Sequence, residues 1–218
     1  MMSSRRVMVG VDEAGRGSLV GDLFVAAVAV ASDCRVELAE AGVRDSKLLS
    51  RSRRYDLLLK IIECSEAIVV SRITPEDIDR ENINDLEVKA IERSMKHLRS
   101  RGLIPARVAV DEIAGREKLV EAVCRRYFPE AEVIMRPNAD RDFVEVSAAS
   151  IVAKTMRDSH IRTLSRTYGE IGSGYPADPR TIDWLNRVRS AGLPKCVRMS
   201  WKTVRRSTSR TLDEFAKK

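Results

Sequence analysis

The sequence lacks the features that mark several large classes of protein. Its four cysteines lie far apart and never in C-x-x-C spacing, so neither a zinc knuckle nor a redox pair is indicated. The N-terminus has no cleavable apolar segment, and the best apolar run, residues 23–31, is too short to cross a bilayer. We therefore expect a cytoplasmic protein with reduced thiols at Cys34, Cys64, Cys124 and Cys196.

Histidine is scarce, and internal repeats and low-complexity tracts are missing. The two histidines, His97 and His160, lie in helical patterns, suit no histidine-based nuclease, and are expected to be structural or surface residues. The 218 residues are 44% hydrophobic and 33% charged, which suits one medium domain, alone or with a small appendage. A net charge of +7 makes a polyanionic partner plausible, although charge alone does not establish one.

Short β-branched runs alternate with longer helical patterns. The expected strands are residues 7–11, 23–31, 67–73, 107–110 and 132–135. Apolar spacing predicts helices over 50–64 and 86–98, and Thr74 and Pro75 open another. We expect the first two strands, joined by a tight glycine turn, to pair antiparallel in an α/β sheet. Glycine and proline gather after about residue 168, so we expect a core over 1–168 and a helical appendage over 169–218 that begins with a helix at 179–189.

Acidic residues follow three of the expected strands. Asp12 and Glu13 end the first and precede a Gly-Arg-Gly turn, Asp111 ends the fourth in the same way, and Asp140 follows the fifth. Carboxylates from separate strands can bracket two divalent ions, which activate water and stabilise the leaving oxygen of a phosphodiester. Taken alone, an acidic pair after a strand is most often a solvated turn, and each of the other two acids could be a turn, loop or cap residue.

Several motifs run in order along nearly the whole chain. They are residues 10–17 (GVDEAGRG) with Gly21, 45–50 (DSKLLS), 110–111 (VD), 139–140 (AD), 147–154 (SAASIVAK) with 157–158 (RD), 174–176 (GYP) and 200–204 (SWKTV). Together they resemble the motifs of archaeal-type ribonuclease HII. The resemblance implies an RNase H-like fold, a mixed five-stranded sheet flanked by helices, with a C-terminal helical region that helps to grip the duplex.

The resemblance also implies an activity and a set of site residues. The activity is endonucleolytic cleavage of RNA paired with DNA, and of duplex DNA 5′ of an embedded ribonucleotide, with Mn²⁺ or Mg²⁺ as cofactor. The implied catalytic and metal-binding residues are Asp12, Glu13, Asp111 and Asp140. The implied substrate-binding residues are Gly15, Arg16 and Gly17 on the ribonucleotide, Lys47, and Tyr175 on the sugar at the RNA–DNA junction.

The substrate-binding roles have a physical basis, because a 2′-hydroxyl distinguishes RNA from DNA and a glycine backbone can approach it closely. The alternative for Gly-Arg-Gly is a plain tight turn. Lys47 and Lys154 suit phosphate contacts or simple solvation equally well. Ser18 and Asp22 stand where the family commonly has proline, and neither change removes a catalytic group.

Other assignments compete with this one. Asp142 lies close enough to replace Asp140 if the alignment slips, although the Ala-Asp step favours Asp140. A nucleotide-dependent oxidoreductase would need G-x-G-x-x-G opening a helix, whereas residues 15–21 are one residue too long and precede a strand. A non-catalytic hybrid-binding module would be expected to lose some of the acids, and all four are present.

The tail, residues 207–218, resembles a degenerate sliding-clamp-binding peptide. We expect the protein itself to be a monomer. Leu212 and Phe215 have the spacing of its two anchors. Ser209 stands where glutamine is usual, and Ala216 where a second aromatic would be. Packing of Leu212 and Phe215 onto the domain is the alternative.

Overall fold

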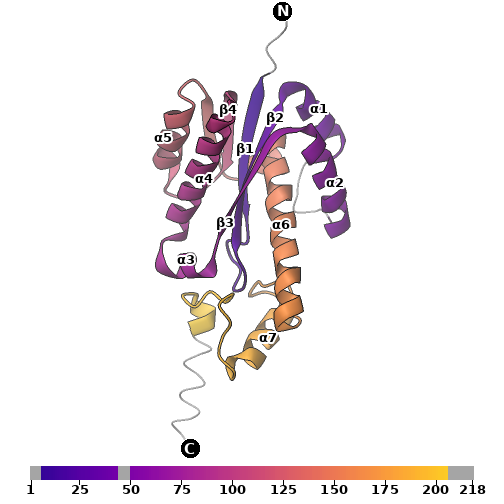
Figure 1. Cartoon of the computed structure of the whole chain (residues 1–218), viewed down its shortest axis with the longest axis vertical. Helices are drawn as coiled ribbons and strands as arrows, with labels where there is room; N and C mark the ends of the chain where they lie inside the picture. The colour runs from indigo at the N-terminus through magenta and orange to yellow at the C-terminus, as the bar shows by residue number, and fades with distance from the viewer. Residues whose placement is uncertain (1–5, 44–49, 206–218) are drawn as a thin grey trace, which may run out of the picture. The chain divides into compact units, whose positions relative to one another are not determined.

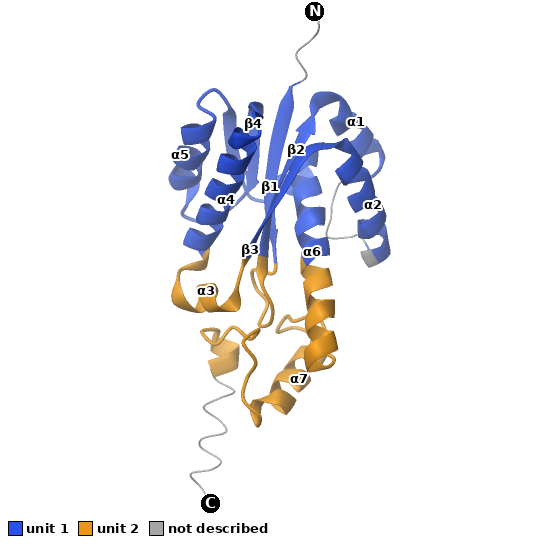
Figure 2. Ribbon diagram, viewed as in Figure 1, with its two compact units in different colours: residues 1–14, 24–72, 84–156 blue, residues 15–23, 73–83, 157–218 orange. Residues whose placement is uncertain are grey.

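The computed structural model describes residues 6–43 and 50–205, which fall into two compact units. Figure 2 shows unit 1, residues 1–14, 24–72 and 84–156, in blue, and unit 2, residues 15–23, 73–83 and 157–218, in orange. The chain passes repeatedly between them, so each unit is assembled from segments that are distant in sequence. No helix in the two described ranges is both long and apolar enough to span a membrane.

Unit 1 is built on a five-stranded sheet of order β3-β2-β1-β4-β5. In Figure 1, β1 lies between β4 and β2. The strands are β1 (Val7–Ala14), β2 (Leu23–Ala31), β3 (Ser65–Ile73), β4 (Pro105–Asp111) and β5 (Glu132–Arg136). β1 pairs antiparallel with β2 and parallel with β4, and β4 pairs parallel with β5. The predicted mixed five-stranded sheet is therefore confirmed, with β1 at its centre.

Helices before and after the strands complete unit 1. They are α1 (Ser32–Glu40), α2 (Arg51–Cys64), α4 (Ile83–Ser100), α5 (Glu117–Tyr127), the short 3-10 helix η1 (Ala139–Arg141) and the first half of α6 (Val144–Tyr168). One apolar cluster joins Val28 of β2 to Leu38 of α1, Ile61 of α2 and Ile151 of α6, all without exposed surface. These three helices therefore share one face of the sheet.

The alternation of side chains along β1 places Gly10 and Asp12 on the face that α6 covers. An added Cβ on Gly10 would lie 2.1 Å from the backbone carbon of Glu145 in α6. No other residue type fits there without moving the helix or the strand. The missing side chain of Gly10 therefore brings α6 close to the end of β1, where the acidic pair lies.

Unit 2 contains α3 (Pro75–Arg80), the second half of α6, α7 (Pro179–Arg189) and long irregular segments. The connection between β1 and β2 belongs to this unit, so it is a structured loop and the expected tight turn is wrong. Leu19 and Val20 of that loop are buried in an apolar cluster with Ile171, Trp184 and Val197. An isolated bridge pairs Val20 with Val197.

Candidate functional site

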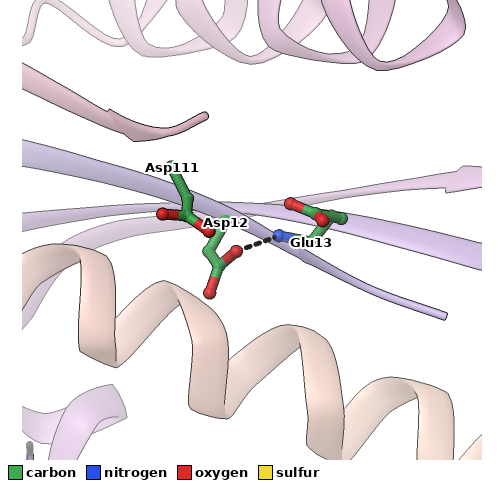
Figure 3. A group of neighbouring side chains, drawn as sticks. All are labelled: Asp12, Glu13 and Asp111. Carbon is green, nitrogen blue, oxygen red and sulfur yellow. Dashed lines mark hydrogen bonds between the residues drawn. The ribbon is translucent and has the colours of Figure 1, made fainter. Parts of the chain in front are cut away.

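Three carboxylates meet at the ends of two adjacent strands of unit 1. The parallel register pairs Val11 with Val110, so Asp12 and Asp111 are neighbours one residue later. Asp12, Glu13 and Asp111 each offer a carboxylate oxygen, and these oxygens all lie within 4.8 Å of one another. Figure 3 shows this acidic group, with Asp12 and Asp111 side by side and Glu13 next along the strand. The strand-end pattern in the sequence thus corresponds to a real cluster.

Asp12 is the most buried member of the acidic group, with 8% of its surface exposed. Burial raises the pKa of Asp12 well above its usual range, and the charges of Glu13 and Asp111 raise it further. The Ser150 side chain on α6 and the Glu13 backbone N–H, 2.8 Å from Oδ1, donate hydrogen bonds that act in the opposite direction. Crowded carboxylate oxygens of this kind suit a hard divalent cation, which removes their mutual repulsion.

Asp140 lies outside the group of three but is linked to it through the backbone. It is 3% exposed, in η1, and the preceding residue, Ala139, donates its N–H to Asp111 Oδ1 at 2.8 Å. The competing Asp142 has a half-exposed side chain, whose Oδ2 lies 2.6 Å from Nη2 of Arg136. The two acids therefore occupy different environments, one buried beside a site residue and one paired at the surface.

The Gly-Arg-Gly segment lies in unit 2, directly after β1. Gly15 adopts φ +98°, and an added Cβ would lie 2.9 Å from the Asp22 carbonyl oxygen, so both conformation and space require glycine. Ser18 donates its Oγ–H and N–H to the Gly15 carbonyl, at 2.9 Å and 3.2 Å. A proline at this position would lack both donors. Gly17 is exposed, and no described atom lies within 4 Å of an added Cβ.

Tyr175, in the same unit, is half-buried and held from one side by an arginine. The Arg157 guanidinium lies 4.3 Å from the centre of the Tyr175 ring and donates a hydrogen bond to the Ser173 carbonyl. Arg157 belongs to one of the sequence motifs, but the sequence alone assigns it no role, because its partner is distant along the chain. Gly174 ties this segment to the β1–β2 loop, since its carbonyl accepts the Leu19 N–H at 2.7 Å.

Five other residues considered in the sequence are either not described by the structure or lie away from the acidic group. Lys47, Leu212 and Phe215 lie outside the described residues. His97 is exposed near the end of α4, and His160 Nε2 lies 3.4 Å from Asp22 Oδ1.

Comparisons with known proteins give one family over nearly the whole chain. The model of the ribonuclease HII family matches residues 9–204. The ribonuclease HII of Sulfurisphaera tokodaii is 42% identical over 200 residues, which cover 91% of this chain and 94% of that protein. The ribonuclease HII of Aeropyrum pernix is 42% identical over 221 residues, 96% of this chain and 98% of that protein.

Solved structures agree with the sequence relatives. Ribonuclease H2 from Pyrococcus horikoshii OT3 superposes with a TM-score of 0.82 at 36% identity, covering 94% of this chain and 98% of that one. RNase HII in a complex with PCNA from Archaeoglobus fulgidus gives 0.77 at 33% identity, covering 90% and 95%. Bst-RNase HIII in complex with Mn²⁺ gives 0.78 at 22% identity, covering 95% and 71%, and at that identity shows the fold alone.

The family match spans both the strand ends that carry the acidic group and the segments of unit 2 that follow them. The predicted resemblance to ribonuclease HII and the predicted RNase H-like fold are therefore confirmed. The acidic group is a candidate metal site of a nuclease. The chain belongs to the ribonuclease HII family, and it is an RNA–DNA hybrid endoribonuclease.

Proposed function

We propose that the chain hydrolyses the RNA strand of RNA–DNA hybrids, and duplex DNA 5′ of an embedded ribonucleotide, in a reaction that depends on divalent metal. The observation that carries the proposal is the meeting of Asp12, Glu13 and Asp111 within 4.8 Å at the ends of β1 and β4. A nuclease site needs concentrated negative charge to hold cations against a phosphate, and this group supplies it.

Asp12, Glu13, Asp111 and Asp140 would hold two Mg²⁺ or Mn²⁺ ions. All four offer oxygen ligands, which both cations accept. When bound, such ions activate a water molecule and stabilise the leaving oxygen. The burial of Asp140, together with the hydrogen bond from Ala139 to Asp111, supports Asp140 over the surface-paired Asp142 as the fourth acid.

Gly15, Arg16 and Gly17 would contact the ribonucleotide. The open space around Gly17 allows a ribose to approach the backbone, whose amides and carbonyls can hydrogen-bond a 2′-hydroxyl. The half-exposed Arg16 can pair with a phosphate, and Lys47 is proposed for the same purpose. Tyr175 would pack on the sugar at the RNA–DNA junction, with Arg157 holding its ring from one side.

The two parts of the chain are proposed to have different roles. Residues 1–168 would carry the catalytic chemistry, and residues 169–218 would help to grip the duplex. The enzyme would act as a monomer.

Because the Archaeoglobus fulgidus relative was solved with PCNA, Leu212 and Phe215 are proposed to bind a sliding clamp. Titrating the clamp of the same organism against the full chain and a chain ending at Ser207 tests this, since equal binding or none rejects the clamp contact.

The decisive experiment uses a DNA duplex with one embedded ribonucleotide. The full chain is incubated with it in the presence of Mg²⁺, Mn²⁺ or a chelator, and the products are sized. We expect cleavage on the 5′ side of the ribonucleotide only with metal. Cleavage with the chelator present, or cleavage of a matched all-DNA duplex, would contradict the proposal.

A further inference from the structure

Arg198 is a large side chain without exposed surface inside unit 2. A buried guanidinium is costly unless its donors are hydrogen-bonded, so the acceptors of Arg198 indicate its role. Its Nε donates to the Gly21 carbonyl at 3.0 Å, and its Nη1 donates to the Arg16 carbonyl at 2.9 Å. Both acceptors belong to the loop between β1 and β2.

These two carbonyls lie near opposite ends of the loop. Arg16 is the middle residue of Gly-Arg-Gly, and Gly21 lies just before β2. Backbone hydrogen bonds tie the middle of the loop to the same C-terminal segment, because Arg198 N–H donates to Leu19 O at 2.9 Å and Gly21 N–H to Cys196 O at 2.8 Å. Among these contacts, only the Arg198 side chain reaches Arg16.

The guanidinium is itself fixed within unit 2. It lies 5.9 Å from the centre of the Trp201 ring, just within the reach of a cation–π contact. Burial lowers the pKa of Arg198 to about 10, which still leaves it charged at neutral pH. Two charge-assisted hydrogen bonds from one rigid fork therefore hold both ends of the loop.

We propose that Arg198 is a positioning residue, which holds the Arg16 carbonyl and thereby orients the backbone of Gly15–Gly17 for contact with the ribonucleotide. This inference rests on the proposed role of Gly-Arg-Gly in recognising the 2′-hydroxyl. The requirement is geometric, because a lysine carries the same charge but places it at a single point and cannot donate along the same fork.

The test compares Arg198→Lys and Arg198→Met with the unmodified full chain. Two duplexes are used, one with a single embedded ribonucleotide and one of identical sequence in DNA only. We expect kcat/KM on the ribonucleotide duplex to fall by roughly 10- to 100-fold in both variants, since a small displacement of a binding group has effects of this size. The ratio of affinities for the two duplexes should fall, while affinity for the DNA duplex changes by less than about twofold.

Two control variants separate positioning from stability. Leu185→Ala removes packing from the apolar cluster of unit 2 and is expected to lower Tm without changing the affinity ratio. Gly17→Ala places a methyl group where no described atom lies within 4 Å, so it should fold normally and lose discrimination directly. Arg198→Lys, which retains the charge, serves if Arg198→Met fails to fold.

The outcomes are distinguishable. Loss of the affinity ratio in Gly17→Ala but not in the folded Arg198 variants would overturn the role of Arg198 and leave that of Gly-Arg-Gly intact. An unchanged ratio in all three variants would overturn both. If neither Arg198 variant folds while Gly17→Ala does, Arg198 is a stabilising residue and the inference is wrong.

Discussion

Among the single residues of the site, Asp12 carries the sharpest conflict between stability and function. It is buried beside two other carboxylates, and this environment favours its neutral form, whereas a metal ligand must be ionised. Residues kept in such an environment are characteristic of functional sites. The same conflict predicts opposite effects of one substitution on activity and on stability.

Asp12→Asn and Asp111→Asn are expected to lower metal-dependent cleavage by roughly 100-fold or more, because each removes a ligand charge. Affinity for a hybrid duplex should change little, since phosphate contacts dominate it. In metal-free buffer, Asp12→Asn should raise stability, measured as a higher Tm, because it removes a carboxyl whose ionisation is unfavourable in this crowded, buried position. Single-turnover cleavage, hybrid binding and thermal melting check the three effects. Full activity in either variant would contradict the metal-site assignment.

Asp140 and Asp142 provide a matched pair of substitutions two residues apart. Asp140→Asn is expected to reduce cleavage by roughly 100-fold, whereas Asp142→Asn loses only a half-exposed ion pair with Arg136 and should change cleavage by less than about twofold. Steady-state cleavage of one substrate by both variants, with circular dichroism to confirm folding, decides between them. The reverse ranking would make Asp142 the fourth acid.

At the scale of elements, the contact of β1 with α6 positions the acidic group. An added methyl group at Gly10 would lie 2.1 Å from the backbone of Glu145, so strand and helix must separate. We expect Gly10→Ala to destabilise the protein by about 2–3 kcal/mol, as overpacked core substitutions do. Denaturant unfolding measures this, with Gly17→Ala as the control because its added Cβ meets no described atom within 4 Å. Equal stabilities of the two variants would mean that α6 does not approach β1 so closely.

The start of α7 predicts a response to acid. The Asp178 carboxylate accepts hydrogen bonds from the backbone N–H groups of Arg180, in its own helix, and of Ser173. The Arg180 side chain also donates to this carboxylate and does most to lower the pKa of Asp178. A lowered pKa means that Asp178 stabilises the native state fully above its unfolded value of about 3.9, and that this stabilisation is lost as the pH falls below that value.

Asp178→Asn should therefore lower Tm at pH 6 and reduce the further loss of Tm between about pH 4 and pH 2, because the charge that titrates there has been removed. Thermal melts across that range provide the measurement. The exposed Asp183 on the same helix supplies the control, Asp183→Asn. If Asp178→Asn retains the whole acid dependence of the unmodified protein, another carboxyl is responsible for it.

How much of these elements the sequence predicts depends on how strongly each segment is patterned. The strands carry continuous β-branched runs, so all five are predicted, with ends that differ by a few residues. The sequence does not predict α1, because this helix buries a single side chain, Leu38, and therefore has almost no apolar periodicity. The tight turn that the sequence predicts between β1 and β2 is wrong, because the contacts that shape this loop come from Gly174, Cys196 and Arg198, far along the chain.

The same limit applies to the site. The sequence predicts that Asp12, Glu13 and Asp111 lie together, because parallel strands end at one edge of a sheet, which is a property of topology. The sequence assigns no role to Arg157 or Arg198, because the ring that Arg157 contacts and the two carbonyls that Arg198 binds come near only in the folded chain. Local patterning thus predicts the acidic group better than the arginines whose contacts form only in the folded chain.

At the scale of the whole molecule, we expect net charge to govern affinity for a duplex, and contacts with the sugar to govern discrimination between RNA and DNA. The net charge of +7 favours any nucleic acid duplex, because each neutralised phosphate releases counterions whatever the sugar. The proposed recognition of a ribonucleotide would depend instead on neutral hydrogen bonds to a 2′-hydroxyl, which release no counterions. Affinity should therefore depend on salt, and discrimination should not.

For every two phosphates that the protein contacts, we expect its affinity for a duplex to fall about tenfold when the salt concentration rises fourfold. Plots of log affinity against log salt for a ribonucleotide-containing duplex and its all-DNA counterpart should be parallel, separated by a constant offset. Fluorescence anisotropy between about 50 and 200 mM salt, with the metal chelated to prevent cleavage, covers the useful range. An offset that shrinks as salt rises would mean that the enzyme distinguishes the two duplexes through additional phosphate contacts, and the assignment of discrimination to the glycine backbone would be wrong.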